Sequence, residues 1–232
     1  MALLVPHAAL FYSGPVAAHA YLRLAEGREP AVIVIVGPDH HGVGPAVAVA
    51  PHARWRTPLG DVTTDHPVKD ALRRRGIALD ARGHRSEHSV EVQLPFLQLL
   101  GFHGPVVPVV MAEHDLDAVW DLAGAIASAA GDREVVLIAS TDLSHYLPHD
   151  QAVQADRAVL DALASGDGRR LLDVVGQRPE GMCGAGPAAA VLEAARRLGG
   201  GRVEVLRYAT SGEVGGERDS VVGYAAAVVG AV

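Results

Sequence analysis

Histidine follows an apolar, strand-like run at three places in the sequence: His7, His40 and His145. In an open α/β sheet, ligands bind in the crevice beyond the carboxyl ends of the strands, so these side chains are candidates for one shared site. Imidazole is the commonest metal ligand and titrates near neutral pH, so the chemistry expected there is metal binding or proton transfer. One histidine after a strand is weak evidence, because few loop residues are functional, but three together are much stronger.

The single cysteine, Cys183, lies in a loop of small residues, 181–187, that leads into an expected helix beginning near Pro187. A cysteine near a helix amino terminus lies at the positive end of the helix dipole, which favours the thiolate that binds metal or attacks carbon. The alternative is a small buried apolar residue with no chemical role. The neighbouring glycines favour a site, because they let backbone and ligand approach closely and provide little packing for a core residue.

A further polar cluster occupies 85–91, at the start of a helix that we expect over 88–100 with Ser86 as its N-cap. We expect His88 to point into the crevice as a substrate-contacting or supporting group. For Glu87 two interpretations stay open: a supporting group of the site, or a carboxylate that stabilises the helix amino terminus. Five other histidines have no comparable context and are expected to be surface or structural residues: His66, His84, His103, His114 and His149.

Composition and missing motifs argue against several classes of function. The chain has 27 acidic against 20 basic side chains, a formal charge of −7 and 4% aromatic residues, so nucleic acid is not expected as a partner. The sequence contains no Walker loop, Rossmann G-x-G-x-x-G, His-Glu-x-x-His or nucleophile elbow. Its apolar runs, such as 31–36, are far shorter than the roughly 20 residues that cross a bilayer. We therefore expect a cytoplasmic protein with a small-molecule substrate and no membrane segment.

Strand-like and helical segments alternate along the chain. Short runs rich in Val, Ile and Ala predict strands over 2–5, 31–36, 46–50, 106–112, 134–140, 203–208 and 221–229. Helical periodicity predicts helices over 16–25, 67–75, 88–100, 116–130, 151–164 and 187–198. The alternation predicts a single α/β domain over 1–232, a three-layer αβα sandwich with a mixed, mainly parallel central sheet. We allow for an antiparallel carboxyl-terminal strand.

Several short motifs follow one another in order along nearly the whole chain. They are Pro-His-Ala (6–8), Phe-Tyr-Ser-Gly (11–14), Gly-Pro-Asp-His-His-Gly (37–42), Thr-Pro-Leu (57–59), Glu-His-Ser-Val-Glu (87–91), Ser-Thr-Asp-Leu-Ser-His (140–145), Cys-Gly (183–184) and Tyr-Ala-Thr-Ser (208–211). None of them is specific alone, but the combination is. It resembles the Memo family, whose bacterial and archaeal members are called AmmeMemoRadiSam system protein B.

The resemblance implies a fold similar to that of the class III extradiol ring-cleaving dioxygenases, which use non-haem iron(II). It also implies a metal site with the ligands His7, His40 and Cys183. Two further groups, Asp142 and His145, would lie beside the metal. The family name further implies a protein partner from a radical-enzyme system. We expect both histidine ligands to lie on loops outside the core. One departure is Ala9, where family members commonly have glycine, so a positive φ next to His7 would be strained.

Iron(II) is the metal expected first, with copper or zinc as alternatives, because a thiolate is a softer donor than the carboxylate used by dioxygenases of this fold. Three protein ligands leave coordination positions open for a substrate. The leading hypothesis is a dioxygenase-type oxidoreductase for a small aromatic or otherwise oxidisable substrate, with His145 as acid and base and Asp142 fixing its tautomer. Two alternatives stay open: an accessory protein that binds metal or a peptide without catalysis, and a zinc hydrolase.

Overall fold

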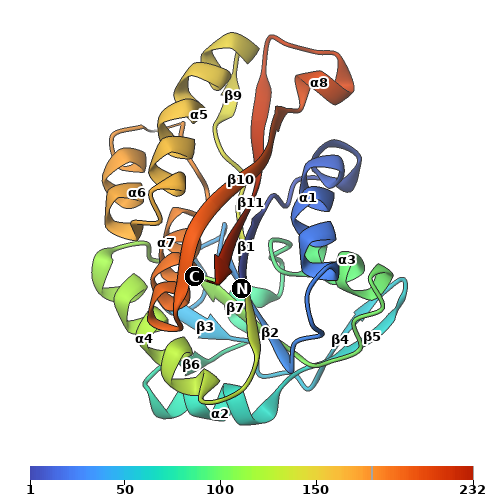
Figure 1. Ribbon diagram of the computed structural model, residues 1–232, viewed down its shortest axis with the longest axis vertical. Helices are drawn as coiled ribbons and strands as arrows, with labels where there is room; N and C mark the ends of the chain where they lie inside the picture. Colours follow the sequence, from blue (N-terminus) through green and yellow to red (C-terminus); the bar gives the residue numbers. More distant parts are fainter. Residues whose placement is uncertain (179, 232) are drawn as a thin grey trace.

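Figure 1 shows the computed structural model of the protein, which describes residues 1–178 and 180–231. Within these residues, nine strands form one sheet in the order β10-β11-β1-β8-β2-β7-β3-β6, with β9 paired to β11. The strand bounds are β1 Ala2–Val5, β2 Val32–Pro38, β3 Val47–Val49, β6 Ala78–Leu79, β7 Val106–Met111, β8 Val135–Ser140, β9 His145–Leu147, β10 Gly200–Thr210 and β11 Val221–Ala231. A separate hairpin joins β4, Arg54–Thr57, to β5, Gly60–Thr63.

The centre of the sheet is parallel. β1 pairs with β8, β8 with β2, and β2 with β7, all in parallel register, so four strands end at the same edge of the sheet. β11 runs antiparallel to β1, and β3 runs antiparallel to β7. The predicted α/β fold with a mixed, mainly parallel sheet is therefore confirmed, as is the antiparallel carboxyl-terminal strand.

Helices cover both faces of the sheet (Figure 1). Their bounds are α1 Leu10–Ala25, α2 His66–Arg74, α3 Leu94–Leu99, α4 Leu116–Ala130, α5 His149–Ala164, α6 Gly168–Val175, α7 Ala185–Arg197 and α8 Gly212–Gly215. Side chains alternate between the faces along β2: Val34 packs in the cluster that contains α4 and α7, and Ile33 packs in the cluster that contains α1 and α3. Residues 185–195 of α7 are all buried, which small alanine and glycine side chains permit.

α1 begins at Leu10, earlier than the predicted residue 16, and contains Pro15. Proline has no backbone N–H, so it interrupts one helical hydrogen bond. Packing of α1 against β1, β10 and β11 offsets this loss. Ala9, at the N-cap, has φ −48° and ψ 133°, which any residue can adopt. The expected strain at Ala9 is therefore absent, and the backbone does not need a glycine at this position.

The prediction of a helix over 88–100 is wrong for the first half of that segment. The segment forms a 3₁₀ turn over Glu91–Gln93 followed by α3, and the N-cap position of the 3₁₀ turn is Val90 rather than Ser86. The physical reason is the carboxylate of Glu87, which accepts the backbone N–H groups of the next two residues and so satisfies them outside a helix. This turn places Glu87 and its neighbours at the carboxyl edge of the sheet.

The sequence patterns missed α6, the β4–β5 hairpin and β9, all of which are short or irregular. α5 begins at His149, two residues before the predicted start. Among the described residues, no helix combines the length and the apolar character that a membrane crossing requires.

Candidate metal centre

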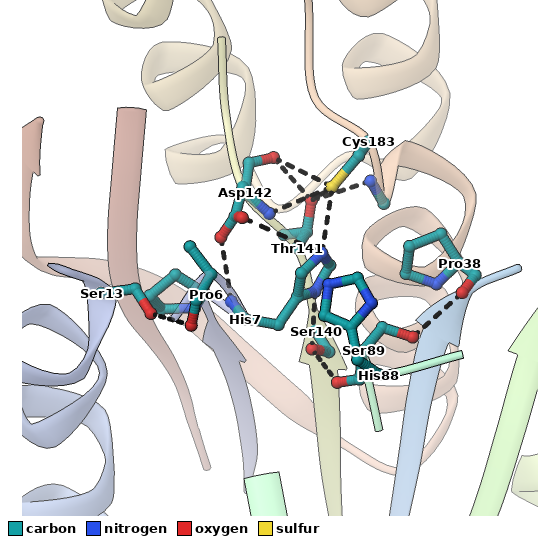
Figure 2. A network of polar contacts seen from close by, with 12 residues as sticks. Pro6, His7, Ser13, Pro38, His88, Ser89, Ser140, Thr141, Asp142 and Cys183 are labelled. Carbon is teal, nitrogen blue, oxygen red and sulfur yellow. Dashed lines mark hydrogen bonds and ion pairs between the residues drawn. The ribbon is translucent and has the colours of Figure 1, made fainter. Parts of the chain in front are cut away.

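Three candidate ligands meet at the edge where the parallel strands end. His7 follows β1, His40 follows β2, and Cys183 precedes α7. One ligand atom from each residue lies within 4.8 Å of the other two. Nε2 of His7 is 3.4 Å from Sγ of Cys183, and Figure 2 shows the two side chains facing one another. A single metal ion could therefore contact all three side chains.

His7 is held by a buried network of hydrogen bonds in which the donor and the acceptor of each bond can be assigned. Tyr21 donates its hydroxyl hydrogen to Oε1 of Gln93. The amide nitrogen of Gln93 donates to the carbonyl of Pro6 and to Oγ of Ser140, at 3.0 and 2.8 Å. Both hydrogens of the amide are thereby used, and the orientation of the amide follows from its partners. Gln93 and Ser140 are completely buried, so these bonds are protected from water.

This network determines which nitrogen of His7 faces the site. Ser140 donates its own hydroxyl hydrogen to the carbonyl of Ser89, so towards His7 its oxygen can only accept. Nδ1 of His7 lies 2.9 Å from that oxygen and must carry the hydrogen. Burial, together with repulsion from neighbouring histidines, lowers the pKa of His7 to about 3, so the ring is neutral at pH 7. The lone pair of Nε2 is left to point towards Cys183.

Glu87 orients His40 in the same way. Its carboxylate lies 3.0 Å from Nδ1 of His40 through either oxygen, and it accepts the backbone N–H of His40 at 2.7 Å. It also accepts the backbone N–H groups of His88 and Ser89. Nδ1 of His40 therefore donates to a carboxylate, the arrangement that fixes the tautomer of many metal-binding histidines. Of the two interpretations left open for Glu87, the contacts favour support of the site.

The charges around His40 favour a bound cation. Hydrogen bonds with Cys183 and Glu87 raise the pKa of His40 to about 10. Burial acts to raise the pKa of Glu87, but hydrogen bonds from His40 and from the backbone of Ser89 lower it well below its usual range. One imidazole thus lies between a carboxylate and a sulfur, and this arrangement of charge would also stabilise a metal ion.

Cys183 is held by the loop that follows β8. Its sulfur accepts the backbone N–H of Asp142 at 3.3 Å, which stabilises a thiolate. The next residue, Gly184, is the N-cap of α7 and donates its backbone N–H to Oγ1 of Thr141 at 2.9 Å. A Cβ atom on Gly184 would lie 2.6 Å from Cβ of Thr141, so only glycine allows this approach.

Asp142 and His145 do not interact as the sequence led us to expect. The buried carboxylate of Asp142 accepts the backbone N–H of His7 at 2.9 Å. Among the described residues, no hydrogen bond joins that carboxylate to the ring of His145, so the expected tautomer role of Asp142 is not observed. Parallel pairing of β1 with β8 explains the difference, because it brings the backbone after Val5 beside Asp142. Burial raises the pKa of Asp142, and backbone hydrogen bonds partly oppose this.

His88 lies beside His7 at the site (Figure 2). Its ring stacks on His40 with a centroid distance of 5.1 Å and an interplanar angle of 17°. It meets the ring of His7 edge-on at 5.3 Å. The side chain is 52% exposed, so His88 is open to solvent while its ring contacts both histidine ligands. The ring of His145 is partly buried in β9, and its charge acts to lower the pKa of His7.

The contacts around the site include three residues that sequence reasoning did not select. Ser140 lies in a recognised motif, but Gln93 has no local signal, because its role depends on partners far away in the chain. His114 follows β7 just as other site histidines follow their strands, and this signal could have found it. Its ring packs against Gly186 of α7, and the charge of His40 contributes to lowering its pKa. His7 is only 2% exposed, so the expectation that both histidine ligands lie outside the core is wrong for His7.

We expect Glu87→Gln to weaken metal binding by about 10- to 100-fold, the usual effect of losing the hydrogen-bond partner of a histidine ligand. A glutamine has one acceptor oxygen, and its amide group would meet the N–H donors of His40. Isothermal titration with Zn²⁺ and Fe²⁺ measures the change. The matched control is Glu91→Gln, because Glu91 is an exposed carboxylate in the same segment and its replacement should leave affinity unchanged. Equal affinity in both variants would contradict the role assigned to Glu87.

We expect Gln93→Leu to reduce the free energy of unfolding by about 3 kcal/mol, because it removes the partner of two buried groups, the hydroxyl of Tyr21 and the carbonyl of Pro6. Urea denaturation of the metal-free protein measures this loss. Gln98→Leu is the control, since Gln98 is half-exposed and should cost less than about 1 kcal/mol. Adding Tyr21→Phe removes the hydroxyl group that Gln93→Leu leaves unpaired, and it should recover part of the lost stability. Strict additivity of the two substitutions would argue against a coupled network.

Comparisons with known proteins identify the class to which this α/β protein with a histidine-cysteine site belongs. A family model described as "Memo-like protein" matches residues 1–228. The chain belongs to the Memo family. A MEMO1 family protein of Methanopyrus kandleri is 46% identical over 231 residues, which cover 97% of this chain and 82% of that protein. A second, from Methanothermobacter thermautotrophicus, is 42% identical over 227 residues, covering 96% of this chain and 82% of that protein.

A solved structure is similar over almost the whole chain. The crystal structure of an uncharacterized protein from Escherichia coli K12 superposes with a TM-score of 0.67 and covers 98% of both chains. Its sequence identity to this chain is 17%, so the similarity is one of fold. The family model and the sequence relatives confirm the resemblance to the Memo family. The solved structure shows that the α/β fold also occurs in an experimentally determined protein.

Proposed function

We propose that this protein is a metal-dependent oxidoreductase that binds iron(II) through His7, His40 and Cys183 and acts on a small aromatic or otherwise oxidisable substrate. One observation carries the proposal: nitrogen and sulfur atoms from three distant segments lie within 4.8 Å of one another. Hydrogen bonds at Nδ1 leave Nε2 of both histidines to face this point. His7 is already neutral, whereas His40 would lose its Nε2 proton when the metal binds, because only neutral imidazole is a ligand.

The donor set suits a catalytic metal rather than a purely structural one. Structural zinc sites use four protein ligands, whereas three ligands leave a position open for water or substrate. Two imidazoles and a thiolate are acceptable to iron, copper and zinc, so donor chemistry alone does not select among them. When bound, iron would supply a Lewis acid and a redox centre for oxygen chemistry. The resemblance to dioxygenases of similar fold adds support by analogy only.

The residues around the metal position have distinct roles in this proposal. His145 accepts a proton from the substrate and returns it, because it is a partly buried imidazole that does not serve as a ligand. His88 faces solvent beside both histidine ligands and contacts the substrate as it enters. Asp142 holds the backbone of His7 and the sulfur of Cys183 in place through its own carboxylate and N–H.

The test is reconstitution of the metal-free protein with iron(II) in the absence of oxygen, followed by metal analysis and by oxygen uptake with a panel of catechols. We expect one iron per chain and uptake with at least one catechol. Stoichiometric iron without uptake on any substrate would contradict the oxidoreductase proposal and favour an accessory metal-binding protein. Zinc in the isolated protein, with no gain of activity on iron loading and hydrolysis of ester or amide substrates, would favour a hydrolase.

A further inference from the structure

Tyr146 has two unusual properties for an aromatic residue. Its side chain is 77% exposed. Its backbone has φ +61°, and among the described residues it is the only one other than glycine with a positive φ. A bulky residue in the left-handed region is uncommon, because its Cβ atom crowds the backbone. Such strain tends to persist at functional sites, where the surrounding structure holds it in place.

The strain arises from a bulge between β9 and β11. Leu147 pairs with Val221 and His145 pairs with Val222, so three residues of β9 oppose two of β11. Tyr146 is the extra residue. Bulges of this kind occur beside active sites, where they change the direction of a side chain.

The bulge brings two consecutive side chains together. In a regular strand, neighbouring side chains point to opposite faces of the sheet. Here the ring centroids of His145 and Tyr146 are 5.8 Å apart, with an interplanar angle of 63°. The exposed ring of Tyr146 therefore lies next to the imidazole that the proposed function uses as its acid and base.

Hydrogen bonds anchor the two residues that precede Tyr146. The backbone N–H and the hydroxyl of Ser144 donate to the buried carboxylate of Asp156 at 2.9 and 3.0 Å. The backbone N–H of His145 donates to the carbonyl of Glu180 at 3.0 Å. The residue before Tyr146 and the one before that are thus both anchored, so the strained conformation is imposed by its surroundings.

Hydrogen bonds tie the segment around Tyr146 to the metal centre. Asp142, four residues before Tyr146, donates its backbone N–H to Sγ of Cys183 and accepts the backbone N–H of His7. The carbonyl that accepts the backbone N–H of His145 belongs to Glu180, three residues before Cys183. An exposed aromatic ring next to a polar catalytic edge suits contact with a flat apolar group.

We infer that Tyr146 is a specificity-determining residue whose ring packs against an aromatic group of the substrate held at the metal centre. The inference rests on the proposed metal site and names a preference for substrates that carry a planar aromatic ring. The bulge in β9 places the ring of Tyr146 beside that of His145.

Ligand binding to the cobalt(II)-loaded protein tests the inference without requiring turnover. Imidazole and 4-phenylimidazole are titrated against the wild type, Tyr146→Ala and Tyr146→Phe, and the visible absorption of the cobalt reports binding. We expect the phenyl group to strengthen binding about tenfold in the wild type and in Tyr146→Phe, and this gain to be lost in Tyr146→Ala. Affinity for imidazole itself should be the same in all three proteins.

The outcomes separate this inference from the proposed function. If cobalt binds and the phenyl group strengthens binding equally in Tyr146→Ala and the wild type, the role of Tyr146 is overturned while the metal site stands. If the wild type binds no cobalt, the proposed metal site fails and the inference fails with it. A second variant, Tyr146→Gly, should raise the melting temperature of the metal-free protein, because glycine tolerates a positive φ. A lower melting temperature would overturn the claim that the backbone is strained.

Discussion

His40→Ala is expected to lower the affinity of the protein for zinc or iron(II) by about two to three orders of magnitude. Four-ligand structural zinc sites have binding free energies of about 10–16 kcal/mol, or roughly 2.5–4 kcal/mol for each ligand. Every 1.4 kcal/mol corresponds to a factor of ten in affinity. Removing one of three ligands should therefore have an effect of this size, larger than that of removing a supporting hydrogen bond.

His40 is the better ligand to remove, because its side chain is 30% exposed and its loss should leave the fold intact. His7 is buried and bonded to Ser140, so its replacement would disturb the core as well as the site. The matched control is His41→Ala, which removes the adjacent histidine of the same loop. Competition titration with a chromophoric chelator measures the affinities, and circular dichroism checks the fold. Equal affinities for the two variants would rule out His40 as a ligand.

His145→Ala is expected to retain a full complement of iron and to lose turnover by about 100- to 10,000-fold, the usual contribution of a general acid and base. The backbone of His145 holds β9 against β11 and does not depend on the side chain, so the bulge should survive the substitution. Metal analysis and oxygen uptake on the same preparation give the two quantities.

Two further variants make the assignment of His145 specific. His88→Ala should weaken the binding of substrate more than it lowers the rate at which bound substrate reacts. The reason is that His88 is exposed and lies beside the ligands rather than in β9. His103 is an exposed histidine outside the recognised motifs, so His103→Ala should change neither substrate binding nor turnover. Loss of iron from His145→Ala would mean that His145 is itself a ligand. If His88→Ala abolished turnover and His145→Ala did not, the two roles would be exchanged.

The sulfur ligand connects the chemistry of the site to its local structure. Cys183 accepts a hydrogen bond from the backbone N–H of Asp142, and the following glycine begins α7. Both features place positive partial charge beside the sulfur, where a metal-bound thiolate would lie. This arrangement depends on β8 and α7 meeting at one edge of the sheet.

The α/β class could be predicted from the amino-acid sequence alone, because the periods of its apolar residues report which faces are buried. The sequence also indicated the edge of the sheet where the site lies, since motifs with His7, His40 and His145 each follow a strand. The Memo family resemblance named His7, His40 and Cys183, whose ligand atoms the fold places within 4.8 Å of one another. These are local signals, and each can be read from a short stretch of chain.

The orientation of these side chains could not be predicted in this way, because it depends on contacts that form only in the folded protein. The tautomer of His7 depends on Ser140 and Gln93, and that of His40 depends on Glu87. Asp142 was expected to act on His145, but the pairing of β1 with β8 directs it to the backbone of His7. Hydrogen bonds between residues far apart in the chain leave no local periodicity or composition, because their geometry exists only after the strands have paired.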